Sequence, residues 1–139
     1  MSLQIEQIRP ELTWQLRRDV LYSNLQKNEM GMDEDNYGYH FAAFKDNYIV
    51  AVVSLFKHGS DWQFRKFAVN ETVQNQGIGK QLLNHILEFV ERENGTGIWC
   101  NARLSATGFY TKSGFTQIGD IFSRNGFEYI VMQKDLPLK

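Results

Sequence analysis

A short loop holds the residues whose types and spacing best suit ligand chemistry. The segment Gln74-Asn75-Gln76-Gly77-Ile78-Gly79-Lys80 places two glycines directly before a strongly amphipathic stretch. Glycine lets a ligand approach the backbone closely, and the first N–H groups of a helix attract anions. Lys80 adds a positive charge. This combination predicts a phosphate-binding loop.

Two familiar phosphate-binding patterns do not fit this loop. A Walker loop requires Gly at position 74 and Ser or Thr at position 81, where this chain has Gln74 and Gln81. A dinucleotide-binding loop requires a third glycine where Leu82 stands, within repeated parallel strand-helix units that the pattern does not indicate. The remaining pattern is Gln-x-x-Gly-x-Gly, from Gln74 to Gly79. A glycine-rich turn that only caps a helix stays open at this point.

Hydrophobic periodicity predicts the elements that must position the loop. The first third has helix-like apolar spacing and predicts one or two amphipathic helices, and residues 30–36 predict a loop entering a strand. Asn94-Gly95 and Gly114 are expected to end two helices, and Asp46-Asn47 and Asn125-Gly126 to form hairpin turns. We expect strands over 39–44, 48–56, 62–69, 97–100, 115–122 and 127–132, and helices over 78–93 and 103–111. This order predicts a layered α/β fold with a mixed sheet.

Length and composition limit the classes of protein. The chain has 139 residues, of which 42% are hydrophobic, so we expect a single domain over residues 1–139. A net charge of -1 and no dense basic run argue against nucleic acid as a partner. No apolar run approaches the roughly 20 residues of a membrane span, so we expect no membrane partner. We interpret Met1-Ser2-Leu3 as a cloning leader.

The Cys and His residues do not suggest metal or disulfide chemistry. Cys100 is the only cysteine, so the chain can form no internal disulfide, and we expect a cytoplasmic location. Cys100 lies in an apolar run and is interpreted as a buried strand residue rather than a nucleophile. His40, His58 and His85 lack the spacing of metal ligands. We therefore expect no metal.

The loop and its context resemble the GNAT acetyltransferase superfamily. The family's acetyl-CoA signature is Gln or Arg, two residues, Gly, any residue, then Gly or Ala, and Gln74 to Gly79 matches it. The family also has a strand before the loop, a strand after the helix, and a second helix ending in a phrase that Phe109 to Phe115 matches. Asn101-Ala102-Arg103 before Phe109-Tyr110 is similar to one branch of the family. Tyr129 stands where that branch often has histidine, which puts a histidine-based role in doubt.

The resemblance implies both a fold and a reaction. The fold is α/β and GNAT-like, the acyl-CoA N-acyltransferase fold, with a single mixed, mostly antiparallel sheet and helices on both faces. The reaction is that of an EC 2.3.1 N-acetyltransferase, which moves an acetyl group directly from acetyl-CoA, as cosubstrate, to a primary amine. The acceptor, a small molecule or a protein, is not identified, and a longer acyl donor stays open. A non-catalytic acyl-CoA sensor or interaction module is the alternative.

The resemblance also implies roles for individual residues. The backbone edge of residues 67–69 would pair with the pantetheine arm, and the loop N–H groups would hold the pyrophosphate. Asn101 would bond the pantetheine chain from the other side, and the Tyr110 phenol would protonate the departing CoA thiolate. The expected cofactor-binding residues are Phe67, Ala68, Val69, Gln74, Asn75, Gln76, Gly77, Ile78, Gly79, Lys80, Asn101 and Phe109.

Other candidate features are left open by the sequence. Glu71, Glu128 and the acidic segment Asp33-Glu34-Asp35 are the candidates for the base that deprotonates the acceptor. The acidic segment is interpreted as a solvated loop, although it could attract a cationic amine. Phe122, Phe127 and Tyr129 in the last hairpin could form a homodimer surface.

Overall fold

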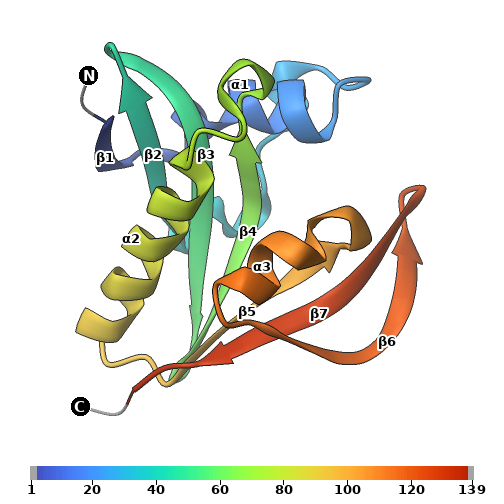
Figure 1. Cartoon of the computed structure of the whole chain (residues 1–139). Helices are drawn as coiled ribbons and strands as arrows, with labels where there is room; N and C mark the ends of the chain where they lie inside the picture. The colour runs from blue at the N-terminus through green and yellow to red at the C-terminus, as the bar shows by residue number, and fades with distance from the viewer. Residues whose placement is uncertain (1–2, 138–139) are drawn as a thin grey trace. The chain divides into compact units, whose positions relative to one another are not determined.

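The computed structural model describes residues 3–137, whose elements are labelled in Figure 1. Met1 and Ser2 of the expected leader lie outside the described residues, but Leu3 begins β1 (Leu3–Ile8) and pairs with Lys45. Leu3 is therefore part of the fold. The chain divides into two compact units. The first runs through Phe56 and from Phe64 to Phe89, and the second runs from Lys57 to Gln63 and from Val90 onward.

Seven strands form one mixed sheet in the order β1-β2-β3-β4-β5-β7-β6. The pairs β1–β2, β2–β3, β5–β7 and β6–β7 are antiparallel, whereas β4–β5 is parallel. This arrangement confirms the expected mixed, mostly antiparallel sheet. The remaining strands are β2 (Tyr39–Lys45), β3 (Tyr48–His58), β4 (Asp61–Val69), β5 (Gly97–Arg103), β6 (Thr116–Arg124) and β7 (Phe127–Asp135).

Both predicted hairpin turns have the backbone geometry that their residues favour. Asp46 and Asn47 have φ angles of 52° and 69°, and Asn125 and Gly126 have 53° and 82°. Two consecutive positive φ angles match the right-handed twist of the flanking strands, and Asn, Asp and Gly adopt them at low cost. The β2–β3 and β6–β7 hairpins are therefore specified locally.

The N-terminal segment differs from the expected pair of amphipathic helices. It begins with β1, and one short helical run follows. Tyr22 N–H donates to the carbonyls of both Arg17 and Arg18, at 3.2 Å each, so the run ends in a widened turn. The run consists of η1 (Pro10–Thr13), α1 (Trp14–Leu16) and η2 (Arg17–Leu21), and the short turns η3 (Lys27–Glu29) and η4 (Asp33–Tyr37) come after it.

Within the first unit, alternate residues of β2 face helices on opposite sides of the sheet. Ala42 packs in a buried cluster with Leu16 of the N-terminal helical run. Its neighbour Phe41 instead contacts the rings of His85 and Phe89 on α2 (Ile78–Arg92), with centroid distances of 5.5 and 5.1 Å. Figure 1 shows α2 in front of β2 and β3. Helices therefore cover both faces, as predicted.

A buried ion pair joins the N-terminal helical run to the turn before β2. Arg17, with 0% of its surface exposed, donates to both carboxylate oxygens of Asp35, at 2.9 and 3.0 Å. Burial by itself raises the pKa of Asp35, but the hydrogen bonds from Arg17 and from Met32 N–H outweigh burial and hold that pKa below its ordinary value. The expectation of a solvated acidic segment is therefore wrong for Asp35. Glu34 is ion-paired with Arg65 at 2.9 Å.

The same network extends to two residues of the sheet. Ser54 Oγ accepts from Arg17 at 2.9 Å and lies 2.7 Å from His40 Nδ1. His40 Nε2 lies 2.9 Å from the carbonyl oxygen of Asp35, so it must carry the proton and donate. Burial lowers the pKa of His40 and keeps the imidazole neutral. His40 is therefore a structural residue of the first unit.

In the second unit, the end of α2 depends on a close backbone approach. Asn94 has a φ angle of 62°, and Gly95 N–H donates to Val90 O at 2.9 Å, as in a left-handed helix cap. A Cβ on Gly95 would lie 2.4 Å from a Val90 methyl carbon and 2.8 Å from Trp62. The sequence therefore predicted this helix end correctly.

The helix expected over residues 103–111 begins later than predicted. Strand β5 continues to Arg103, a 3-10 turn covers Leu104–Ala106, and α3 covers Thr107–Lys112. Gly114, with a φ angle of 92°, follows this helix as expected. Among the helices of the described chain, none is long and apolar enough to cross a membrane.

Candidate functional site

Strand β4 is irregular at Lys66, which has a φ angle of 57°. The rings of Phe64 and Phe67 lie in contact, with centroids 6.0 Å apart, although residues three apart in a regular strand face opposite sides. Arg65 and Lys66 both reach the N-terminal segment, Arg65 at Glu34 and Lys66 at Tyr22. Arg65 and Lys66 are therefore consecutive residues on one face of the strand, and Lys66 is left-handed. These are the features of a β-bulge.

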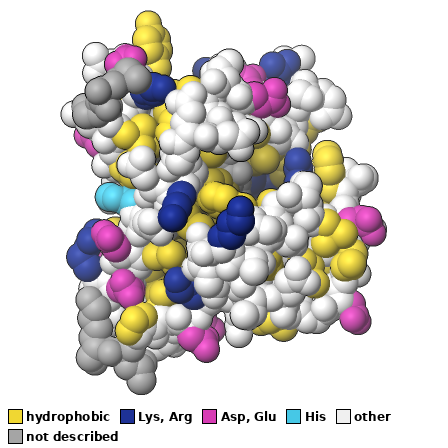
Figure 2. Space-filling view, in the orientation of Figure 1, with side chains coloured by type: hydrophobic (Ala, Val, Ile, Leu, Met, Phe, Trp, Pro, Cys, Tyr) yellow, Lys and Arg dark blue, Asp and Glu magenta, His cyan; other side chains and the backbone are white. Residues whose placement is uncertain are grey.

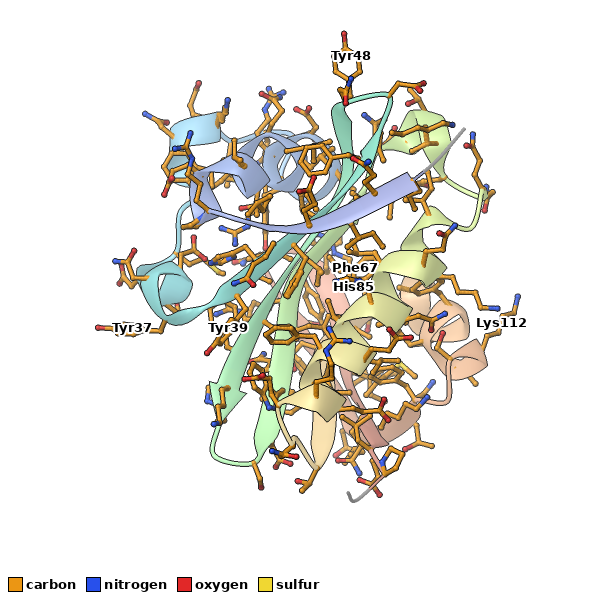
Figure 3. All side chains as sticks on the ribbon, turned by 90° about the vertical axis from the view of Figure 1, so that its left-hand side faces the viewer. Tyr37, Tyr39, Tyr48, Phe67, His85 and Lys112 are labelled. Carbon is orange, nitrogen blue, oxygen red and sulfur yellow. The ribbon has the colours of Figure 1, made fainter. Side chains whose placement is uncertain are left out.

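The residues expected to bind pantetheine come directly after this bulge. Ala68 is buried against Leu16, whereas Phe67 and Val69 are half-buried at the end of β4. In Figure 3, Phe67 lies on the side of β4 toward α2, where His85 is also labelled. The parallel ladder pairs Asp61–Gln63 with Gly97–Trp99, at the start of both strands. Residues 67–69 lie beyond this ladder, and the bulge that precedes them determines which way their side chains point.

Side-chain hydrogen bonds fix the glycine loop to neighbouring segments of the first unit. Gln74 donates from its side-chain amide to the carbonyl of Val69 at 3.0 Å, and Gln76 accepts from Lys45 at 3.0 Å. Asn70 Oδ1 accepts from the Thr72 backbone N–H at 2.9 Å and caps the turn η5 (Glu71–Val73). Lys45 and Asn70 support the loop but were not predicted from the sequence. Asn70 could have been found, because Asn commonly caps a turn.

Helix α2 begins within this loop segment, so the loop contains the N–H groups of the first helical turn. Gly77 O accepts the first helical hydrogen bond from Gln81 N at 3.1 Å, so the first helical residue is Ile78, where the helix was predicted to begin. Ile78 is 5% exposed and anchors the first turn in the core. The N–H groups of residues 78–80 have no partner within the helix, and they lie at its positive end.

The loop has two left-handed positions, and the backbone at one of them, Gly77, leaves space for a ligand. Asn75 and Gly77 have φ angles of 65° and 80°. A Cβ on Gly77 would meet no heavy atom within 4 Å, so the surface in front of this residue is open. Open space beside the unpaired N–H groups of a helix start fits a diphosphate. The described residues therefore suit the pyrophosphate of a coenzyme in this loop.

The second unit contains the other predicted site residues. Asn101 is half-buried on β5 opposite Val131 of β7, and Phe109 is 36% exposed. Tyr110 is only 7% exposed, and its ring lies 5.1 Å from that of Phe109 and 5.8 Å from that of Phe115. Burial first, and then the nearby Cys100, raise the pKa of the Tyr110 phenol. The phenol is therefore neutral and carries its proton at physiological pH.

Cys100 and the candidate bases can also be placed. Cys100 is buried on β5, and burial raises the pKa of its thiol to about 12. It packs in the core as predicted, and a thiol in this state is a poor nucleophile. Asp35 and Glu34 are already paired with arginines, whereas Glu71 and Glu128 are exposed. No group of three or more His, Cys, Asp or Glu residues within 3–137 could hold a metal ion.

The last hairpin carries exposed aromatic and aliphatic side chains. Phe127 is 43% exposed with the Arg103 guanidinium 3.9 Å from its ring centroid, and Phe122 and Tyr129 stack at 5.7 Å. Ile121 on β6 is also exposed. Figure 2 shows one face of the molecule, where Lys and Arg side chains lie at separate places. A homodimer through this hairpin stays a prediction.

The sheet and its loop define the class of protein. A bulged strand leads through a glycine-containing loop into a long helix, and the following strand returns in parallel beside it in the sheet. This is the acyl-CoA N-acyltransferase fold. The family model described as "Acetyltransferase (GNAT) domain" matches residues 8–136. The chain therefore belongs to the GNAT acetyltransferase family.

Individual relatives agree with this assignment. The "Uncharacterized N-acetyltransferase YitI" of Bacillus subtilis (strain 168) is 26% identical over 96% of this chain and 97% of its own length. A ribosomal-protein-S18-alanine N-acetyltransferase from Escherichia coli is 15% identical, with a TM-score of 0.82 over 99% of this chain and 96% of its own. A GNAT family acetyltransferase from Elizabethkingia anophelis, solved with acetyl-CoA bound, is 20% identical, with a TM-score of 0.75 over 96% and 98%. These solved structures share the fold.

Proposed function

We propose that this protein transfers an acetyl group directly from acetyl-CoA to a primary amine. The observation that carries the proposal is the start of α2, where unpaired N–H groups lie beside the open surface at Gly77 in a chain of the GNAT family. Such a helix start accommodates anions, and a diphosphate is among them. The acetyl-CoA bound to the Elizabethkingia anophelis relative supports this ligand.

The resemblance to the family supports the remaining roles. The backbone of residues 67–69 would pair with the amides of pantetheine, as a strand adds to a sheet edge. The neutral amine would attack the thioester carbon, its nitrogen would release a proton to solvent, and the C–S bond would then break. Tyr110 would give its proton to the departing thiolate, and solvent would return a proton to the phenol. Burial raises the pKa of Tyr110, so the phenol carries this proton before the reaction begins.

The proposal is tested by binding and turnover on one sample. The purified chain is titrated calorimetrically with acetyl-CoA, and release of free CoA thiol is then followed with a panel of amines. We expect binding, and thiol release that depends on both protein and amine. Binding without release of CoA in the presence of any amine would favour an acyl-CoA sensor. Competition by longer acyl-CoAs would change the acyl donor that we propose. No binding at all would refute the loop assignment.

Tyr110→Phe tests the general acid. We expect the turnover number to fall by about 100-fold, because the thiolate then leaves without a proton donor. Acetyl-CoA affinity should change by less than about twofold, since the aromatic ring and its packing stay. Single-turnover kinetics with calorimetry separate the two quantities. Tyr48→Phe is the matched control, because Tyr48 is 76% exposed in the β2–β3 hairpin. Equal turnover numbers for the two variants would show that Tyr110 serves only in packing.

A further inference from the structure

Lys66 holds a positive charge immediately before the strand residues assigned to the acetyl donor. Within the described part of the chain, its ammonium contacts Tyr22 and no carboxylate. The neighbouring cation, Arg65, is neutralised by Glu34 at 2.9 Å. The bulge turns both side chains to the same side of β4, but only one of the two charges is balanced. An unbalanced, half-buried ammonium favours a negatively charged ligand.

The position of this ammonium is determined by the fold. Lys66 Nζ lies 4.4 Å from the centroid of the Tyr22 ring and donates to the Tyr22 hydroxyl. Tyr22 itself ends the N-terminal helical run, where its N–H is bonded to two carbonyls. Lys66 also adopts a left-handed backbone, which is a strained conformation for a residue other than glycine. Such strain is typical of positions where a side chain must point in one direction.

The hydrogen-bonding capacity of the pair is only partly used. An ammonium has three N–H donors, and the bond to Tyr22 takes one of them. Because the Tyr22 oxygen accepts from Lys66, its own O–H can donate to another group. Lys66 and Tyr22 therefore together present donors that suit the oxygens of a carboxylate or a phosphate.

We propose that Lys66 and Tyr22 bind an anionic group on the acceptor, so that the acceptor class is an amine that carries a carboxylate or phosphate. This inference rests on the proposed function, because Phe67 adjoins the expected position of the acetyl carbonyl. The same charge repels polyamines from this position and favours the uncharged form of the acceptor amine, which is the form that attacks. Lys66 is thus a specificity-determining residue.

The test compares matched amines of similar length. Thiol release is measured with an α-amino acid, its carboxamide, an aminoalkyl phosphonate and a diamine. We expect the anionic amines to have kcat/KM values at least about tenfold above those of the carboxamide, and the diamine to be the poorest. The kcat/KM values for the α-amino acid and for the phosphonate show which anion is preferred. A wild-type preference for the carboxamide or the diamine would overturn the proposal.

Variants then assign the preference to particular residues. Lys66→Met should lower kcat/KM for the anionic amines by about tenfold relative to that for the carboxamide, whereas Lys66→Arg should restore part of the preference. Tyr22→Phe keeps the ring and removes the hydroxyl, and it should give a smaller loss. Lys27→Met, at an exposed position of η3, is the control. An unchanged preference in folded Lys66→Met contradicts the proposal.

Binding separates failure of this inference from failure of the proposed function. If no amine releases CoA, the proposed function fails, and the inference is decided by calorimetric titration of the protein with the α-amino acid and the phosphonate in the presence of CoA. Binding that is lost in Lys66→Met supports the anion site. Absence of binding, or equal binding by both proteins, overturns it.

Discussion

Gly77→Glu is expected to weaken acetyl-CoA binding by about 100-fold, or about 2.7 kcal/mol. The φ angle of Gly77 is 80°, so a side chain there strains the loop that precedes α2. The open surface in front of Gly77 would be filled by a carboxylate, which repels the diphosphate and blocks its approach to the backbone N–H groups. Calorimetric titration of both proteins with acetyl-CoA measures the effect.

The matched control for this variant is Gly59→Glu. Gly59 also has a left-handed backbone, with a φ angle of 66°, and a Cβ there would likewise meet no heavy atom within 4 Å. The two substitutions therefore introduce the same charge and a similar backbone cost. Gly59→Glu should bind acetyl-CoA like the wild type, and both variants should lose similar stability. Equal affinities of the two variants for acetyl-CoA would show that the diphosphate does not lie at Gly77.

Arg17→Met is expected to reduce the free energy of unfolding by about 3–5 kcal/mol. Methionine keeps much of the side-chain volume, but it leaves the carboxylate of Asp35 buried without its two hydrogen bonds from the guanidinium. Ser54 and the carbonyl of Met30 also lose a donor. Urea unfolding curves, analysed by linear extrapolation, give the difference between the two proteins.

A double variant separates the charge from the packing. Arg17→Met combined with Asp35→Asn removes the buried carboxylate as well, so it should recover part of the stability that Arg17→Met alone loses. Arg18→Met, at a half-exposed neighbour, is the control and should cost less than about 1 kcal/mol. If Arg17→Met cost no more than Arg18→Met, the Arg17–Asp35 pair would contribute little to the fold.

Elements that depend on neighbouring residues were predicted well. The apolar arc of α2 and the Asp46-Asn47 and Asn125-Gly126 turns all have the predicted form. These features arise within a few residues, because side-chain periodicity and the tolerance of positive φ angles act locally. Strand β1 was missed, because its short alternation is ambiguous until it pairs with β2.

The sequence by itself determined the loop Gln74–Gly79, the helix that follows it, the order of most elements and, through resemblance, the family. Only the tertiary structure decided which charged groups have an oppositely charged partner. Asp35 looked like part of a solvated acidic segment, yet Arg17 pairs with it across 18 residues. Lys66 lies within a predicted strand, but the bulge and Tyr22 set the position of its side chain. Burial and charge pairing depend on groups that are distant along the chain, so only the folded protein shows which groups remain unpaired.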